Sequence, residues 1–415
     1  MISDNTPLKV YTFLFLTCFT LFWGLYKWIG LGLFSYMAAD FALFTVAAVF
    51  SIAIVLQNGG QFVLHKGSLL FVALFVLVWV EIFHTGTVAV TQPVYLTLSE
   101  AFPYISVCLE AFVLSRLIRS KEDLNWFMGA VEAASILIAC FSILQFILFP
   151  HIIIFPTDPL PLRNGLHRIY VGGGSILSIG ALISVGNLLS TREKKGIALL
   201  NIILVFVTLA LVRQARSNTA YLLFVCLAGI LAASNIPKAV RWVIYVGMGG
   251  LLIIGFIYAD GAEWVTSFAQ SDDGIRARMT GIRFFLEKFK EYPLFGMGFI
   301  TTSGNLDPVS YGLLCSPSGY RFDRSDVGII GVLNLFGILG VVWYGAFLYR
   351  IGGNALALSR SKGQLHGKLI LWYLVVTSVN LIVMTMQMSM MIALTVVLTD
   401  KLREFSVSDG ERAWE

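Results

Sequence analysis

Residues 68–86 read SLLFVALFVLVWVEIFHTG, an apolar run in which Glu81 is the only charged side chain. A helix that crosses a bilayer needs about 20 mostly apolar residues. The run does not alternate polar and apolar residues, as a strand of a membrane barrel would. Residues 68–86 therefore predict a membrane-spanning helix.

The whole chain shares this composition. Hydrophobic residues make up 57% of the 415 residues, charged residues make up 13%, and the mean hydropathy is +0.82. A soluble domain carries roughly 25% charged residues, so this chain cannot cover a water-facing surface. In lipid the backbone must satisfy its hydrogen bonds within helices. We therefore predict an all-α, polytopic integral membrane helix bundle.

Apolar runs of spanning length recur along the chain, which predicts about 12 transmembrane helices. The expected spans are 10–28, 34–56, 68–86, 96–116, 125–149, 171–190, 196–212, 219–234, 241–258, 327–349, 369–386 and 387–399. The last two form one long run, so a short hairpin and a single tilted helix both remain open. The predicted organisation is nine spans in 1–258, a long loop at 259–326, three spans in 327–400 and a tail at 401–415.

Lysine and arginine in the short loops predict the orientation. Basic clusters at 116–121, 192–195, 238–241, 350–368 and 401–403 fall on the same side as the N-terminus. Cytoplasmic loops carry such an excess of basic residues, which predicts an inner-membrane protein with a cytoplasmic N-terminus. The opposite loops, at roughly 150–170, 213–218 and 259–326, are then periplasmic, and a loop as long as the last is usually functional.

The long loop contains one amphipathic helix, predicted at 275–290. Its apolar residues recur at spacings of three and four, and Arg276, Arg283 and Lys290 recur every seven residues on another face. We expect this helix to lie on the membrane surface or on the bundle, with its basic stripe directed elsewhere.

Arginines occur on the side of the membrane that the positive-inside rule disfavours. They are Arg163, Arg168, Arg213, Arg216, Arg276, Arg278, Arg283, Arg321 and Arg324. A guanidinium is a permanently charged planar fork that suits phosphate and diphosphate oxygens. The set predicts a site for a lipid diphosphate, although single members could instead pair with nearby acidic residues or with lipid headgroups.

Carboxylates provide two further interpretations. Asp323 and Asp326 stand at the mouth of a spanning helix, where a carboxylate could accept a proton from a sugar hydroxyl or cap the helix together with Ser325. Other carboxylates lie within or near the spans, at Asp40, Glu81, Glu100, Glu110 and Glu132. Intramembrane carboxylates are typical of proton-coupled transporters, so a transporter remains an alternative.

The five cysteines show neither a disulfide framework nor metal-ligand spacing, and we predict no metal and no cofactor. The net charge of +5 arises from basic residues at helix ends, so we expect no nucleic-acid partner.

Three stretches together resemble the superfamily of O-antigen polymerases and O-antigen ligases, which are bacterial membrane glycosyltransferases. The first is Val-Arg-Gln-Ala-Arg-Ser-Asn-Thr at 212–219. The second runs from the arginines of the loop helix to Pro-Leu-Phe-Gly-Met-Gly at 293–298. The third runs from Arg-Ser-Asp at 324–326 to Phe-Gly-Ile-Leu-Gly at 336–340. They cover about a quarter of the chain, and their order resembles that of the superfamily.

The resemblance implies a GT-C-like bundle that performs metal-independent, inverting glycosyl transfer at the periplasmic face. The donor would be a glycan on undecaprenyl diphosphate, with Arg213, Arg216, Arg276, Arg283 and Arg324 binding the diphosphate. Arg163, Arg168, Arg278 and Asp323 would contact the glycan or the acceptor. Expected partners are the lipid-linked oligosaccharide, membrane lipids and a chain-length regulator protein.

This sequence departs from the ligases at the head of the third stretch. Ligases usually carry a histidine there, where this chain has Arg324. The departure favours a polymerase of surface-polysaccharide repeat units, with Asp326 or His167 as the catalytic base. A ligase that transfers glycan to lipid A-core and a flippase of lipid-linked sugars are the alternatives. A flippase should show internal repeats, and none is visible.

Overall fold

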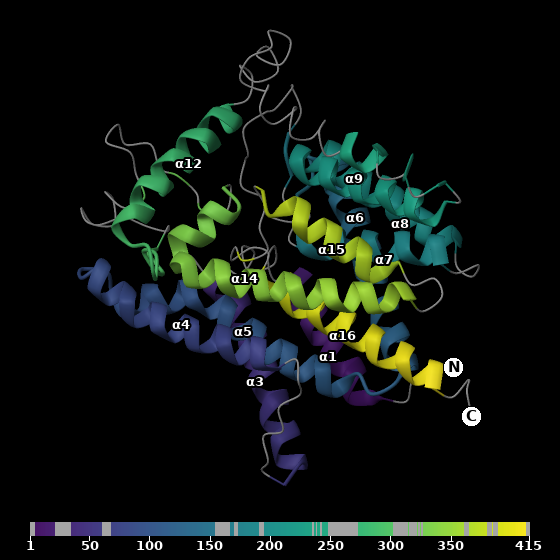
Figure 1. Ribbon diagram of the computed structural model, residues 1–415, viewed down its shortest axis with the longest axis horizontal. Helices are drawn as coiled ribbons and strands as arrows, with labels where there is room; N and C mark the ends of the chain where they lie inside the picture. The colour runs from purple at the N-terminus through teal and green to yellow at the C-terminus, as the bar shows by residue number, and fades with distance from the viewer. Residues whose placement is uncertain are drawn as a thin grey trace.

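The computed structural model is a bundle of helices (Figure 1). It describes residues 5–20, 35–59, 68–153, 167–169, 173–190, 195–234, 236–237, 239–240, 243–247, 273–301, 314, 322, 324, 327–360, 365–379, 384 and 389–411. In the first half of the chain the helices are α1 (Thr6–Thr20), α3 (Ser35–Gln57), α4 (Ser68–Val88), α5 (Val94–Leu117), α6 (Lys121–Leu148) and α7 (Gly174–Ser190). The second half contains α8 (Lys195–Val207), the π-helical turn η1 (Thr208–Val212), α9 (Arg216–Ala233), α12 (Asp273–Glu291), α14 (Ile329–Arg360), α15 (His366–Thr377) and α16 (Met390–Glu411).

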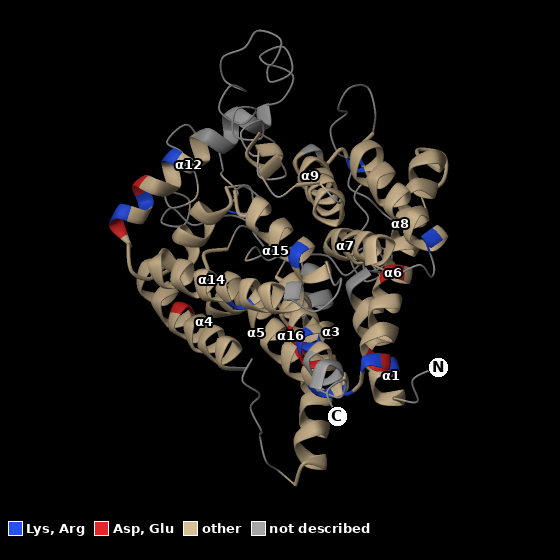
Figure 2. Cartoon of the chain, turned by 45° about the vertical axis from the view of Figure 1, so that its right-hand side comes forward, with Lys and Arg blue, Asp and Glu red and all other residues tan. Residues whose placement is uncertain are grey.

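Within the described ranges, five stretches are long and apolar enough to cross a membrane. They are Leu69–Val88, Val94–Leu117, Lys121–Leu148, Lys195–Val212 and Ile329–Leu358. Three more apolar helices are shorter, at Phe41–Gln57, Gly174–Ser190 and Ser217–Ala233. Figure 2 shows that charged residues gather mostly near helix ends and on α12, while long helix faces carry none. These helices confirm the prediction, made from composition, of an all-α membrane protein. The count of 12 spans and the periplasmic loop stay predictions.

Near the C-terminus the helices run further than the sequence predicted. α14 continues to Arg360, past the expected end at 349, and α16 continues to Glu411, through most of the expected tail. Polar side chains on these extensions bind each other, because Arg350 pairs with Asp400 at 2.7 Å and Asn354 Nδ2 donates to Asp400 Oδ1 at 2.6 Å. α15 ends at Thr377 and α16 begins at Met390, so the last apolar run contains two helices.

The predicted loop helix is present as α12, which covers the expected range 275–290. Its apolar face packs on the start of α14, where Phe285 is buried with Phe322 and Val327. α12 stands apart from α9 in both Figure 1 and Figure 2. Only one side of this basic helix is therefore covered by the described part of the bundle.

Loops predicted to share one side of the membrane are bonded to each other in pairs. The contacts are Arg168 with Arg213, and Gln92 with Phe299. Asn5, next to the predicted cytoplasmic N-terminus, donates to the carbonyl of Leu117, the last residue of α5, at 2.7 Å. This pairing agrees with the predicted alternation of the spans, while the cellular side of each end stays a prediction.

α14 is interrupted at Gly337, whose backbone angles (φ 60°, ψ −154°) are not helical. The turn at 293–298 fills the break. Met297 N and Gly298 N donate to the carbonyls of Asn334 and Leu335 at 2.7 and 3.0 Å, and Ile338 N donates to Pro293 O at 3.0 Å. Broken helices are tolerated in membranes where neighbouring groups satisfy the freed backbone. These hydrogen bonds therefore join the second and third of the three stretches that resemble the O-antigen superfamily.

Replacing Gly337 with alanine should reduce the yield of folded protein. A Cβ atom there would lie 2.3 Å from Leu294 O and 2.6 Å from Gly296 N, so rigid backbone would have to move. The disallowed backbone region alone costs roughly 1–3 kcal/mol. The matched control is Gly345→Ala in the same helix, where a Cβ atom meets nothing within 4 Å. Size-exclusion chromatography of detergent extracts should show a monodisperse peak for Gly345→Ala and a strongly reduced one for Gly337→Ala. Equal peaks would contradict the close packing of the turn at 293–298 against Gly337.

Candidate anion-binding corner

The turn between α8 and α9 holds Arg213 in a fixed place. Arg213 N donates to Thr208 O at 2.8 Å, and Ala215 N donates to Leu209 O at 2.8 Å, so the helix widens before it ends. Gln214 then takes a positive φ of 50° in the short turn that leads into α9. As a result, the Arg213 side chain turns into the bundle and is only 7% exposed.

The guanidinium of Arg213 lies against the first residue of α7. A Cβ atom on Gly174 would stand 2.4 Å from Arg213 Nη1, so only glycine leaves room for this contact. Burying an arginine at the N-terminus of a helix places two positive features together, because the helix dipole is positive at that end. This arrangement favours an anion as the third component.

The N-terminus of α9 adds to the positive potential. Arg216 is the first residue of this helix, and the residue before it, Ala215, provides no side-chain cap. Backbone N–H groups at the start of a helix can bind an anion. We call Arg168, Gly174, Arg213 and the first turn of α9 the arginine corner.

Residues 167–169 of the predicted first periplasmic loop line the arginine corner. Ile169 N donates to Val212 O at 3.0 Å, and Arg168 Nε donates to Arg213 O at 3.4 Å. The neighbouring His167 is exposed and packs edge-on against Phe149 at 4.8 Å between ring centroids. Two predicted site residues, Arg168 and Arg213, are thus in direct contact, and His167 is next to them.

Next to the arginine corner, a cluster of buried polar side chains joins α7, α9 and α15. Tyr373 Oη on α15 donates to Asn218 Oδ1 of α9 at 2.6 Å and lies 2.9 Å from Ser178 Oγ of α7. Asn218 Nδ2 also donates to Ser178 Oγ, at 3.2 Å. Ser178 follows Gly174 by four residues and Asn218 follows Arg216 by two, so the cluster holds the two helix N-termini at a constant separation.

Arg324 has a different environment from the one expected. Its Nη1 and Nη2 atoms donate to the carbonyls of Gly298 at 2.8 Å and Ile300 at 3.4 Å. Gln92 and Thr85 fasten the same segment, through Phe299 O and Phe299 N. In this arrangement Arg324 fixes the turn that fills the α14 break, and a diphosphate would have to compete with two carbonyls for it.

Arg283 is an exposed residue of α12 and is not joined to the arginine corner by any described contact. Arg276 and Arg278 lie in the first half of α12, and Arg216 lies at the start of α9. The side chains of these three arginines lie outside the part of the chain that the structure describes. Arg163, Arg321, Asp323 and Asp326 lie outside the described residues altogether. The shared cavity expected for Arg283, Arg213 and Arg216 therefore stays a prediction.

Sequence reasoning missed the supporting residues. Nothing in the sequence indicated that the side chain of Arg213 lies against Gly174. Tyr373, Asn218 and Ser178 come from three separate helices and share no motif. Their proximity depends on how α7, α9 and α15 pack.

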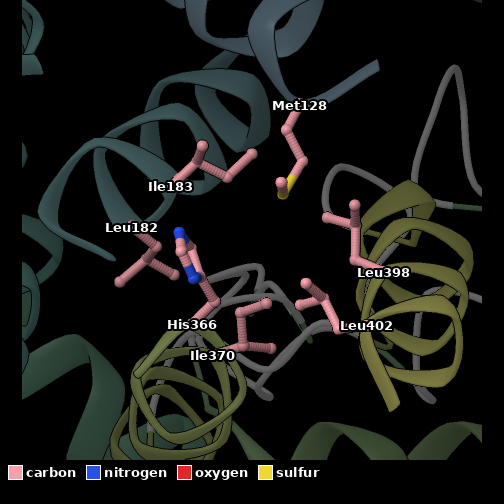
Figure 3. Close-up of a pocket in the computed structure, with 7 residues that line it drawn as sticks. All are labelled: Met128, Leu182, Ile183, His366, Ile370, Leu398 and Leu402. Atoms are coloured by element: carbon pink, nitrogen blue, oxygen red, sulfur yellow. The ribbon is translucent and has the colours of Figure 1, made fainter. Parts of the chain in front are cut away.

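A narrow pocket elsewhere in the bundle has an apolar lining (Figure 3). Its lining residues are Met128, Leu182, Ile183, His366, Ile370, Leu398 and Leu402. His366, the one polar residue, is engaged with Asn187 Oδ1 at 3.2 Å through Nε2. The pocket lacks the converging polar groups of a binding site. Within the described ranges there is also no group of three or more His, Cys, Asp or Glu side chains that could hold a metal.

Comparison of the chain with known protein families and with curated proteins of established function gives no match.

Proposed function

We propose that the protein polymerises oligosaccharide repeat units carried on undecaprenyl diphosphate, and that the arginine corner binds the diphosphate. The observation that carries the proposal is the burial of the Arg213 guanidinium against the N-terminus of α7, beside Arg168 and the start of α9. A diphosphate has the charge and the planar oxygen pairs that such a corner accommodates. The resemblance to O-antigen polymerases and ligases supplies the class of donor.

The proposed reaction is a single inverting displacement. The acceptor hydroxyl attacks the anomeric carbon of the donor glycan, a new glycosidic bond forms, and the bond to the diphosphate oxygen breaks. The proton of the hydroxyl passes to a base, for which Asp326 and His167 are the candidates. Negative charge grows on the departing diphosphate, and fixed positive groups at that point lower the barrier.

A transporter of lipid-linked sugars is the second candidate, and the buried carboxylates favour it. Glu81 is fully buried in α4, and Glu132 of α6 is buried and accepts a hydrogen bond from Ser184. Ionisable residues inside spans usually mark pathways for ions or substrates. The position of the arginine corner at a helix end suits an enzyme better, because a transporter needs its charges along a central path.

Reconstitution separates these functions. Purified protein in liposomes would receive lipid-linked repeat units, first alone and then with lipid A-core as an acceptor. A ladder of lipid-linked polymer without the added acceptor supports the polymerase. Transfer only to lipid A-core would establish a ligase, and movement of unchanged donor between the leaflets would establish a flippase. Either of these two results would overturn the proposal.

A further inference from the structure

The carboxyl group of Glu81 is buried inside the bundle and has no hydrogen-bond partner in the part of the chain that the structure describes. The side chain is 0% exposed, and neither carboxylate oxygen has a hydrogen-bond partner among the described residues. Glu81 belongs to α4, one of the helices long enough to cross a membrane. An ionised carboxylate in such a place requires a neutralising group, because burying an unpaired charge is very costly.

Asn334 on α14 is a second buried polar side chain in the same situation. It is 0% exposed, and its Oδ1 and Nδ2 atoms have no hydrogen-bond partner within the described part of the chain. It lies one turn before the helix break at Gly337. Native structures satisfy nearly all buried polar atoms, so each exception indicates a bound water, an ion or a functional group.

Glu81 and Asn334 lie at the same depth of the bundle. Trp343 Nε1 donates to Leu70 O at 2.8 Å and fixes α14 against α4, and the two helices lie alongside each other (Figure 1). The turn at 293–298 lies between the two helices at this level, because Gly298 N donates to Leu335 O at 3.0 Å and the Cβ position of Gly298 lies 3.3 Å from Glu81 O. Glu81 and Leu335, the chain neighbour of Asn334, thus both contact Gly298 of that turn.

Both residues also border the turn that fills the helix break. Asn334 O accepts from Met297 N at 2.7 Å, and Glu81 O lies 3.3 Å from the Cβ position of Gly298. Thr85, one turn after Glu81 on the same face of α4, accepts from Phe299 N at 2.7 Å. The side of α4 that carries Glu81 thus faces the turn and the break in α14.

We infer that Glu81, Asn334 and the carbonyl groups beside the α14 break form a binding site for a monovalent cation such as Na⁺. A carboxylate, an amide oxygen and main-chain carbonyls are hard oxygen ligands. The carbonyls of Asn334 and Leu335 each accept one hydrogen bond from the turn and keep a second lone pair. Interrupted membrane helices coordinate Na⁺ in this way in transporters. One positive charge balances the one buried carboxylate.

Arg324, the cation bound to the same turn, is engaged with other groups. Arg324 donates to the carbonyls of Gly298 and Ile300, on the other part of the turn, and forms no described ion pair with Glu81. His84 of the same helix contacts Gly296 O through Nε2 at 3.0 Å. Neither Arg324 nor His84 therefore takes the place of a bound cation beside the Glu81 carboxylate. The inference does not depend on the proposed glycosyl transfer.

The test measures thermal unfolding of the purified full-length protein in detergent, in sodium chloride and in choline chloride of equal ionic strength. A ligand that binds only the folded state raises Tm with its concentration, so Na⁺ should raise the wild-type Tm by a few degrees over choline. Glu81→Gln should remove the difference. Glu132→Gln is the matched control, because that carboxylate is buried but already hydrogen-bonded to Ser184, and it should keep the difference.

Radioactive sodium binding provides a second measurement that needs no variant. The wild-type protein should bind it, and an excess of unlabelled Na⁺ but not choline should displace it. Equal Tm values in both salts together with no bound sodium would overturn the inference and indicate that a proton neutralises Glu81. A Na⁺ effect that survives in Glu81→Gln would overturn the assignment of the site. Polymer formation is measured in a separate experiment, so neither outcome of the sodium experiments decides whether the protein is a polymerase.

Discussion

Replacing Arg213 with alanine should give a folded protein that makes no detectable polymer. The side chain is buried, and its removal takes a permanent charge away from the N-terminus of α7. Losing a charged hydrogen bond costs roughly 1.5–3 kcal/mol, which corresponds to about ten- to a hundred-fold in rate. The loss is larger if the contact strengthens as charge develops on the leaving diphosphate. The measurement is polymer formed per unit of purified protein in liposomes.

Arg213→Lys should also be severely impaired, because a point charge cannot form two parallel bonds to phosphate oxygens. The matched control is Arg119→Ala, an exposed arginine in the turn between α5 and α6. That variant should retain full activity. Normal polymer from Arg213→Ala, at normal protein level, would remove the arginine corner from the mechanism.

Replacing Gly174 with alanine should impair the same reaction without changing any charge. The added Cβ atom would stand 2.4 Å from Arg213 Nη1, and the flexible end of that side chain can move away where backbone could not. We therefore expect a folded protein whose guanidinium is displaced from the corner, with activity reduced about ten-fold or more, since small misplacements of catalytic groups are costly. Polymer yield and Tm are both measured.

The control for Gly174→Ala is Gly129→Ala on α6, where a Cβ atom has nothing within 4 Å. It should match the wild type in Tm and in activity. If Gly174→Ala keeps full activity, the contact between Arg213 and the start of α7 is unimportant for the reaction. A large fall in Tm for Gly174→Ala would show instead that backbone had to move.

Local patterns predicted the helices well. The run 68–86 and the three-and-four spacing of 275–290 appear as α4 and α12, because hydrophobic length and periodicity act within one segment. The extension of α14 beyond 349 was missed because its charged residues resemble a loop. Only packing reveals that Arg350 has Asp400 as a partner on a distant helix.

The candidate site was predictable only in part. Arg213 could be selected because an arginine at that end of a helix is disfavoured unless it has a use. Its contact with Gly174 and the support from Tyr373 depend on the crossing of α7, α9 and α15. Arg324 shows the limit of motif reasoning: it was selected by the same argument, yet its guanidinium binds the carbonyls of Gly298 and Ile300.

Binding of undecaprenyl diphosphate tests the central claim most directly, because it needs neither the glycan nor the acceptor. Labelled lipid would be titrated into wild-type protein, Arg213→Ala and Arg119→Ala in detergent at constant ionic strength. The arginine corner predicts that Arg213→Ala binds the lipid at least about ten-fold more weakly, while Arg119→Ala binds it like the wild type. Equal affinity for all three proteins would contradict the claim that Arg213 holds the diphosphate.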